Sequence, residues 1–367
     1  MRSLTITIFT LLAFGLKISG QIEEQNIEHL EKLSLNIRSI NFVKNNEYFN
    51  PITEGYTLLG FFFRPELVYS PSAKITLRAG THILSYSGAG KFSDVRPLFS
   101  TTLNISEKTN LTIGSLSGSD RHNLFDPHFD SERLYSSYAE DGFQVTTVND
   151  HLFSDTWLSW ENFIFKGDST REVFTFGESF RYTSSSFADI FSFELPVQLQ
   201  FKHFGGQISN YPEHVETLFN LAAGLKINID IAKERFGKAG VEYLQFINRQ
   251  FNGESQAGVS QGYASWFRLH YSYKALYVGA AYWKGHNFYA PNGNMIYSSI
   301  SDYQENVVIP ERKIITNYFY LTLLPESYLE LFLGLETYYD IDIKRLDSAI
   351  SLHLSFDKLI NLATQKK

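Results

Sequence analysis

The sequence predicts an all-β chain whose antiparallel strands close into a barrel across a membrane. Three observations support this: an export-type N-terminal segment, apolar residues at every second position in many segments, and short connections that alternate with long ones. The composition agrees, because 16% of the 367 residues are aromatic and only 19% are charged. A disordered chain would be poorer in aromatic residues and richer in charge.

The first 20 residues have the pattern of an export signal. Arg2 precedes a thirteen-residue apolar core at 4–16, and Gly20 offers a small residue for cleavage before Gln21. This core is shorter than the ~18 apolar residues that a spanning helix needs, which favours a cleaved signal over an anchor. The predicted division is a signal peptide at 1–20, a polar periplasmic lead-in at 21–32, the barrel at 33–357 and a polar C-terminal tail at 358–367.

Charge and cysteine content exclude several classes of protein. Lys and Arg number 32 against 39 Asp and Glu, and this formal charge of −7 argues against a nucleic-acid partner. The chain has no Cys, so disulfides, thiolate metal sites and a Cys nucleophile are excluded. The mean hydropathy of −0.18 does not fit a helical membrane protein.

Alternation with a period of two is the main structural signal. In residues 191–202 (FSFELPVQLQFK), Phe, Leu and Val occupy every second position. Successive side chains of a strand point to opposite faces, so this segment has one apolar and one polar face. The same division recurs at 219–230, 329–336 and 350–357.

Such strands fit either a soluble sandwich, which buries the apolar face, or a membrane barrel, which turns it towards lipid. Most of the candidates are longer than the ~5–6 residues of soluble strands and approach the ~9–11 that cross a bilayer. The sixteen candidates are 33–42, 55–69, 74–85, 92–104, 109–118, 142–149, 152–164, 172–183, 191–204, 216–231, 238–250, 262–273, 276–284, 313–324, 328–340 and 347–357.

Connection lengths favour the barrel over the sandwich. Connections after even-numbered candidates tend to be short, and those after odd-numbered candidates tend to be long, the longest being 119–141 and 285–312. Outer-membrane barrels have tight turns at one end and long loops at the other. The segment 183–190 is long for a turn and 341–346 is short for a loop, and counts of 14 or 18 strands fit nearly as well.

With these features the chain resembles the porin-type outer-membrane β-barrels of Gram-negative bacteria. The segments 55–70 (GYTLLGFFFRPELVYS) and 155–168 (DTWLSWENFIFKGD) are similar to a poorly characterised barrel family of the Bacteroidota. The resemblance implies a location in the outer membrane rather than a particular activity. One departure is that the chain continues after Phe356, whereas many such barrels end on an aromatic residue.

Strand parity predicts a set of charged side chains on the polar, lumen-facing wall. Arg64, Arg78 and Arg96 come from three successive strands and are expected to form a positive patch that influences ion passage. The full predicted set is Arg64, Arg78, His82, Arg96, Glu194, Lys202, Lys226, Asp230, Arg268, His270, Glu330 and Glu336.

Signals for catalysis or metal binding are weak. The segment 119–141 is rich in acids and histidines (His122, Asp126, His128, Asp130 and Glu132), but their spacing matches no known ligand set. We expect this segment to fold inward as a charged loop. The chain lacks G-x-S-x-G, H-E-x-x-H and phosphate-loop motifs, so no catalytic residue, cofactor or metal is predicted. If a lipase or protease site exists, the lumen-facing candidates for its base are His82, His270 and His353.

The first functional hypothesis is a porin-like channel for small polar solutes, since about 16 strands enclose an aqueous lumen unless loops fill it. Three alternatives stay open: an outer-membrane barrel enzyme, a barrel that binds a surface glycan or partner, and a secreted soluble all-β carbohydrate-binding protein. The expected surroundings are outer-membrane lipid and small polar solutes, without nucleic acid, and homo-oligomers are possible.

Overall fold

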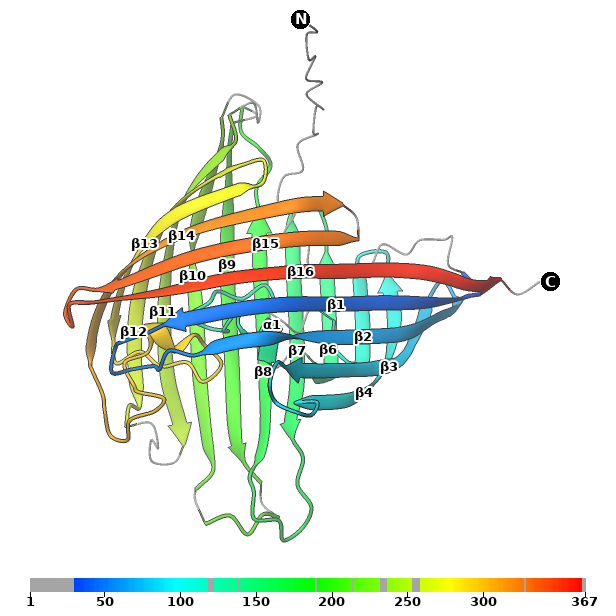
Figure 1. Cartoon of the computed structure of the whole chain (residues 1–367), viewed down its shortest axis with the longest axis horizontal. Helices are drawn as coiled ribbons and strands as arrows, with labels where there is room; N and C mark the ends of the chain where they lie inside the picture. Colours follow the sequence, from blue (N-terminus) through cyan, green and yellow to red (C-terminus); the bar gives the residue numbers. More distant parts are fainter. Residues whose placement is uncertain are drawn as a thin grey trace, which may run out of the picture.

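The computed structural model describes residues 30–117, 122–136, 139–188, 190–206, 208–212, 214–231, 236–252, 258–326 and 328–364. Within this part of the chain, sixteen antiparallel strands form one closed barrel in which β1 pairs with both β2 and β16 (Figure 1). The predicted fold class is therefore confirmed, with the count of sixteen rather than 14 or 18.

The strands are long and follow one another around the barrel in chain order. Their bounds are β1 (Lys32–Glu47), β2 (Thr57–Ser72), β3 (Ile75–Tyr86), β4 (Asp94–Ser106), β5 (Thr109–Ser115), β6 (Asp141–Val148), β7 (Leu152–Asn162), β8 (Glu172–Thr183), β9 (Phe191–Gly205), β10 (Glu216–Asp230), β11 (Lys238–Asn252), β12 (Gln261–Tyr273), β13 (Leu276–His286), β14 (Glu311–Glu326), β15 (Leu329–Asp340) and β16 (Arg345–Thr364). A short helix α1 (Arg133–Ser136) and a 3-10 helix η2 (Met295–Tyr297) lie in two of the loops.

The two ends of the barrel differ in the length of their connections. Strands β2 and β3 are joined by residues 73–74, and β4 and β5 by 107–108, whereas β5 and β6 are joined by 116–140 and β13 and β14 by 287–310. In barrels of this kind the tight turns face the periplasm and the long loops face outside. We therefore call the two ends periplasmic and extracellular. Two connections depart in length from this alternation, as the sequence predicts. The long connection near 183–190 lies at the periplasmic end, and the short one near 341–346 lies at the extracellular end.

Side chains alternate between lumen and lipid along every strand. In β2, Phe62, Arg64 and Glu66 are buried inside, while Phe61 and Phe63 are exposed on the outer wall. Closure pairs the backbone of each strand on both sides, which a strand needs in hydrocarbon because no water can bond its free groups. Within the described residues, no helix is both long and apolar enough to span a membrane.

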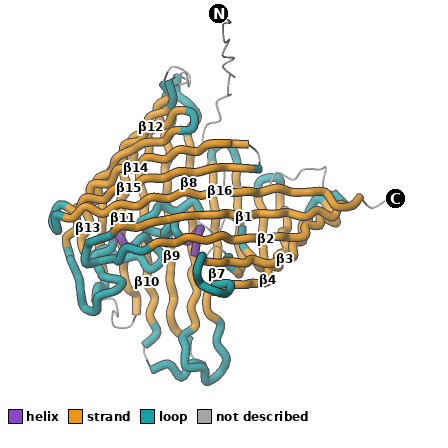
Figure 2. The backbone as a smooth tube through the Cα atoms, in the orientation of Figure 1, coloured by secondary structure: helices purple, strands orange, loops and turns teal. Residues whose placement is uncertain are grey.

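Two long loops fold into the barrel instead of extending away from it. Figure 2 shows loop segments and short helices inside the ring of strands. We call the described residues of 116–140 and 287–310 together the plug. The large side chains Trp157, Trp283, Phe246, Phe288 and Ile296 at the boundary between plug and wall are less than 2% exposed. The expectation that these two segments fold inward is thus confirmed.

The C-terminal segment differs from the prediction. Residues 358–364, expected to be a polar tail, continue β16 and pair with the beginning of β1, where Lys358 lies opposite Ile37. The reason is that β1 begins at Lys32 and would otherwise leave its first residues as an unpaired edge, which closure removes. The predicted signal peptide at 1–20 and residues 21–29 of the predicted lead-in at 21–32 lie outside the described residues, and Lys32, the last residue of that lead-in, begins β1.

Candidate functional site

The plug is attached to the wall through polar contacts on many sides. Near β1, Asn46 donates from Nδ2 to Glu132 Oε1 at 2.6 Å, and on the β16 side Tyr135 Oη lies 2.8 Å from His353 Nδ1. On the opposite side, Gln200 of β9 donates from Nε2 to the carbonyl of His128 at 2.8 Å. Three buried apolar clusters fill the space between these bonds. The loops therefore occupy the extracellular half of the lumen.

His122 joins the first plug loop to β7. Its Nδ1 lies 3.0 Å from Asp155 Oδ2, its Nε2 lies 3.0 Å from Glu140 Oε2, and its ring stacks on Trp157 at 3.8 Å. Burial alone would lower the pKa of His122, but the carboxylates of Asp155 and Glu140 outweigh burial and raise that pKa to about 9. The ring is then an imidazolium ion with both N–H groups occupied, which suits a structural clamp and not a catalytic base.

Glu132 of the same loop shares one buried lysine with Glu336 of β15. Lys44 of β1 lies 3.2 Å from Glu336 Oε2 and 3.9 Å from Glu132 Oε1. Burial, followed by the nearby charges of Glu336 and Glu132, raises the pKa values of Asp126 and Asp130. Among the described residues, no group of three His, Asp or Glu side chains is arranged to hold a metal ion.

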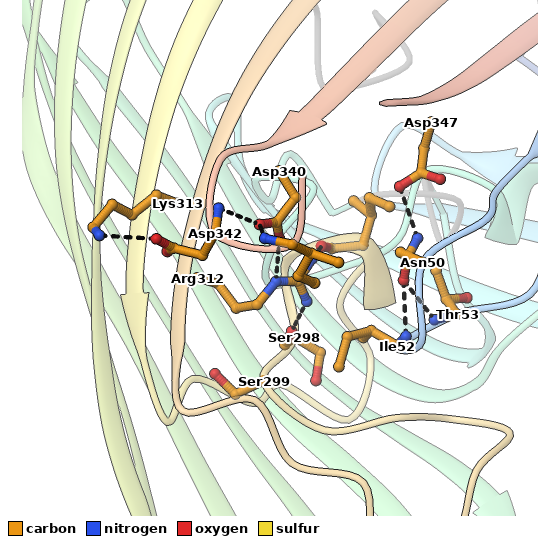
Figure 3. Close-up of polar contacts among 12 residues, drawn as sticks. Asn50, Ile52, Thr53, Ser298, Ser299, Arg312, Lys313, Asp340, Asp342 and Asp347 are labelled. Carbon is orange, nitrogen blue, oxygen red and sulfur yellow. Dashed lines mark hydrogen bonds and ion pairs between the residues drawn. The ribbon is translucent and has the colours of Figure 1, made fainter. Parts of the chain in front are cut away.

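The second plug loop is held by a buried amide and a buried guanidinium. Asn292 donates from Nδ2 to Thr175 Oγ1 and to Gln200 Oε1, each at 3.0 Å. Arg312, at the start of β14, donates to Asp340 Oδ2 at 2.6 Å and to the carbonyl of Ser298 at 2.5 Å (Figure 3). These contacts fix the loop to the wall on two sides of the lumen.

The connection between β1 and β2 is also hydrogen-bonded to the wall and to the second plug loop. Asn50 donates to Asp347 Oδ2 at 2.9 Å, and its Oδ1 accepts from the backbone N–H groups of Ile52 and Thr53 (Figure 3). Thr53 in turn donates to Asp302 of the second plug loop at 2.8 Å. The connection 48–56 is thereby joined to both the wall and the plug.

The register corrects one grouping of the predicted lumen charges. In the register of β2 and β3, Phe63 lies opposite Ile83 and Glu66 opposite Gly80. This register places Arg64 opposite His82. On the other side of β3, His82 lies opposite Arg96. Arg78 pairs instead with Val68, four residues nearer the periplasm. The tight turn at 73–74 fixes this offset. The transverse row is therefore Arg64, His82 and Arg96, and Arg64 is paired with Glu66 at 2.9 Å.

Several other predicted charges form pairs with the wall. Lys226 lies 3.2 Å from Glu194, and Arg268 lies 2.7 Å from Glu242. Lys202 bonds to Glu161 and donates to Asn292 of the plug. The two remaining acids lie near the periplasmic end, Asp230 at the last position of β10 and Glu330 at the second position of β15.

The three lumen-facing histidines predicted as candidates for a catalytic base are His82, His270 and His353. In the contacts that the structure describes, their partners are aromatic side chains and not a serine. His353 meets Tyr135, and the His270 ring stacks on Tyr277 at 5.6 Å. The ring of His82 lies 5.2 Å from that of Phe62.

A histidine outside the predicted set, His203, lies on the outer wall. His203 of β9 has the same parity as the lipid-facing Phe191, Phe193 and Phe201. Its Nδ1 lies 2.9 Å from Thr217 Oγ1 of β10, and its ring stacks on Phe174 of β8 at 4.8 Å. The sequence signal was a histidine on the apolar face of an otherwise regular strand.

This histidine sits at the edge of an outward-facing aromatic band. In one part of this band the ring of Trp160 contacts that of Phe174. In the other part the ring of Phe201 contacts those of Phe176 and Phe219. All of these positions lie in the extracellular parts of β7 to β10. Aromatic rings at this height form the girdle at a membrane interface.

Comparison with solved structures confirms the resemblance to outer-membrane barrels. A loop-deletion mutant of OmpT, an outer-membrane protein of Vibrio cholerae, has a TM-score of 0.54 at 10% identity, covering 89% of this chain and 99% of that one. OprD of Pseudomonas aeruginosa has a TM-score of 0.50 at 11% identity, covering 92% and 96%. At such identities the likeness concerns the fold alone. The protein is thus an outer-membrane-type β-barrel.

The family is shown by a direct match over nearly the whole chain. The chain belongs to the Lipid A 3'-O-deacylase-type family, whose model matches residues 24–365. No curated protein matches the chain.

Proposed function

We propose that the protein is a membrane-embedded hydrolase that removes an acyl chain from a lipid A-type glycolipid of the outer leaflet. The name of its family points to this chemistry. The observation that carries the proposal is the filled lumen. A barrel whose interior is occupied by packed loops offers its outer wall and rim to a substrate, and a lipid in the surrounding leaflet reaches both without entering the barrel.

The same observation argues against the first functional hypothesis from the sequence, a porin-like channel for small polar solutes. Sixteen strands enclose an aqueous channel only where loops leave it open. Here Trp283 and Phe246 of the wall pack on Phe288 of the plug, with ring centroids 5.0 and 5.8 Å away. The likeness to OprD concerns the fold and lends the channel no further support.

The test uses purified protein in vesicles made of lipid A and phosphatidylethanolamine. We expect release of free fatty acid, together with a lipid A product lighter by one acyl group, both measured by mass spectrometry. Protein that has been boiled and has lost its barrel serves as the control. Unchanged lipid A after prolonged incubation with folded protein would overturn the proposal.

Release of fatty acid from phosphatidylethanolamine instead of lipid A would keep the hydrolase and overturn the glycolipid substrate. The two lipids are separated by mass in the same sample, so one measurement distinguishes these outcomes.

A further inference from the structure

We propose that Thr217, His203 and Glu172 form the acyl-transfer site of this hydrolase on the lipid-facing wall, with Thr217 as nucleophile and His203 as its base. This inference rests on the proposed function and names the residues that perform it. It places the chemistry on the outside of the barrel, although the buried polar contacts of the plug lie within.

The three side chains come from adjacent strands and lie in order across them. His203 and Thr217 are direct cross-strand partners, and their side chains are in hydrogen-bond contact at 2.9 Å. Glu172 of β8 pairs with Gly205, two residues beyond His203 on β9. Diagonal neighbours of this kind lie within reach of long side chains, and the Glu172 carboxylate acts electrostatically on the His203 ring.

Gly205 leaves the space that this arrangement needs. A Cβ at Gly205 would stand 2.7 Å from His203 Nε2 and 3.0 Å from Val215 Cγ1. Any larger residue there would displace the imidazole edge that faces away from Thr217. Nδ1 therefore serves the hydroxyl, while Nε2 lies beside Gly205, the cross-strand partner of Glu172. A hydroxyl, a base within hydrogen-bond reach and a third group to orient that base are the parts of an activated nucleophile.

The height of the trio in the membrane suits an ester of a glycolipid. Phe201 and Phe219 lie two residues towards the hydrocarbon from His203 and Thr217, Phe174 lies directly beside His203, and the three rings belong to the aromatic band. Exposed Phe163 and Phe165 lie on the extracellular side, in the connection between β7 and β8. Acyl esters of a lipid lie between its chains and its headgroup. A lipid packed along this wall therefore brings its ester carbonyl to the level of Thr217.

Backbone hydrogen bonds join the two connections on the extracellular side of the site. The N–H of Gly167 donates to the carbonyl of Ile208, and that of Asn210 donates to Asp168, each at 2.8 Å. These bonds tie the connection after β7 to the connection after β9. Phe165 and Ile208 are exposed residues of these two joined connections, on the extracellular side of the site.

The reaction follows from these positions. Thr217 Oγ1 attacks the ester carbonyl as His203 accepts the hydroxyl proton, and Glu172 stabilises the imidazolium that forms. The bond to the sugar oxygen then breaks, and His203 returns the proton to that oxygen. Water, activated by His203 in turn, attacks the acyl-threonine. The products are a free fatty acid, the sugar alcohol and regenerated Thr217.

The test measures fatty-acid release from lipid A vesicles by the wild type and by Thr217→Val, Thr217→Ser, His203→Phe and Glu172→Gln. Loss of the base or the nucleophile should reduce the rate on the order of 100-fold or more, whereas Thr217→Ser retains a hydroxyl and activity. Matched controls are Thr81→Val, which removes another outward hydroxyl, and His151→Phe at the periplasmic end of the same wall. Both controls should act like the wild type.

A second measurement identifies the nucleophile directly. An alkyl fluorophosphonate should modify Thr217 in the folded wild type, as read by peptide mass spectrometry, and should fail to do so in His203→Phe. Each variant must run faster unboiled than boiled on a gel, which shows that its barrel has formed.

The outcomes separate this inference from the proposed function. Hydrolysis by the wild type that persists in Thr217→Val and His203→Phe would overturn the site while the hydrolase stands. No hydrolysis by the wild type would overturn the hydrolase and with it the site. Loss of both hydrolysis and labelling in Thr217→Val and His203→Phe, with activity kept in the two controls, would establish the site.

Discussion

The clamp around His122 predicts a specific loss of stability at alkaline pH. Folding raises the pKa of this imidazole from 6.5 to about 9 because Asp155 and Glu140 each contact one ring nitrogen. The stabilisation is therefore complete below pH 6.5 and disappears as the pH rises through about 9. At about 1.4 kcal/mol per pKa unit, the shift corresponds to roughly 3 kcal/mol.

The measurement compares urea unfolding of the wild type and of His122→Gln in detergent micelles, followed by tryptophan fluorescence. Between pH 6.5 and pH 9.5, the wild type should lose about 3 kcal/mol more unfolding free energy than the variant. Other titrating groups contribute equally to both proteins and cancel in this difference. An equal loss in the two proteins would show that His122 is not held as an imidazolium ion between the carboxylates.

Two further predictions concern the seam of the plug and the lipid-facing wall. Arg312→Gln leaves Asp340 as a buried, unpaired charge and should cost about 3–5 kcal/mol in unfolding free energy. The double variant Arg312→Met with Asp340→Leu should recover most of this loss. Equal stability of the single and double variants would contradict a buried pair. Leu225→Arg, on the outer face in the middle of β10, should cost about 2–4 kcal/mol, against about 0–1 for Leu346→Arg at the extracellular end of β16. Equal costs at the two depths, measured by the same urea titration, would mean that the membrane boundaries are misplaced.

The strands could be predicted from the sequence because one physical rule governs them. A wall between lipid and lumen imposes alternation on every strand, as in residues 191–202, and closure imposes short and long connections in turn. The end of β16 differs from the predicted polar tail at 358–367, because β16 continues as a strand to Thr364. Its strand conformation comes from the pairing of Lys358 with Ile37, a contact between the two ends of the chain.

The plug and the outer site depended on information that the sequence pattern does not carry. The length of 119–141 indicated an inward loop, but the contact of His122 with Asp155 requires the loop's path through the lumen. The sequence-based candidates for a catalytic base are lumen-facing histidines only. His203 is not among them because it follows the apolar parity of its strand, and its contact with Thr217 depends on the register of β9 and β10.

Conductance in a planar lipid bilayer tests most directly the central claim that packed loops fill the barrel. We predict that the folded wild type inserts without stepwise conductance, and that a variant lacking residues 119–136 shows ion-conducting steps because water then occupies the part of the lumen that this loop fills. Stable conductance steps from the wild type, comparable in size to those of the deletion variant, would contradict the claim and restore the channel hypothesis.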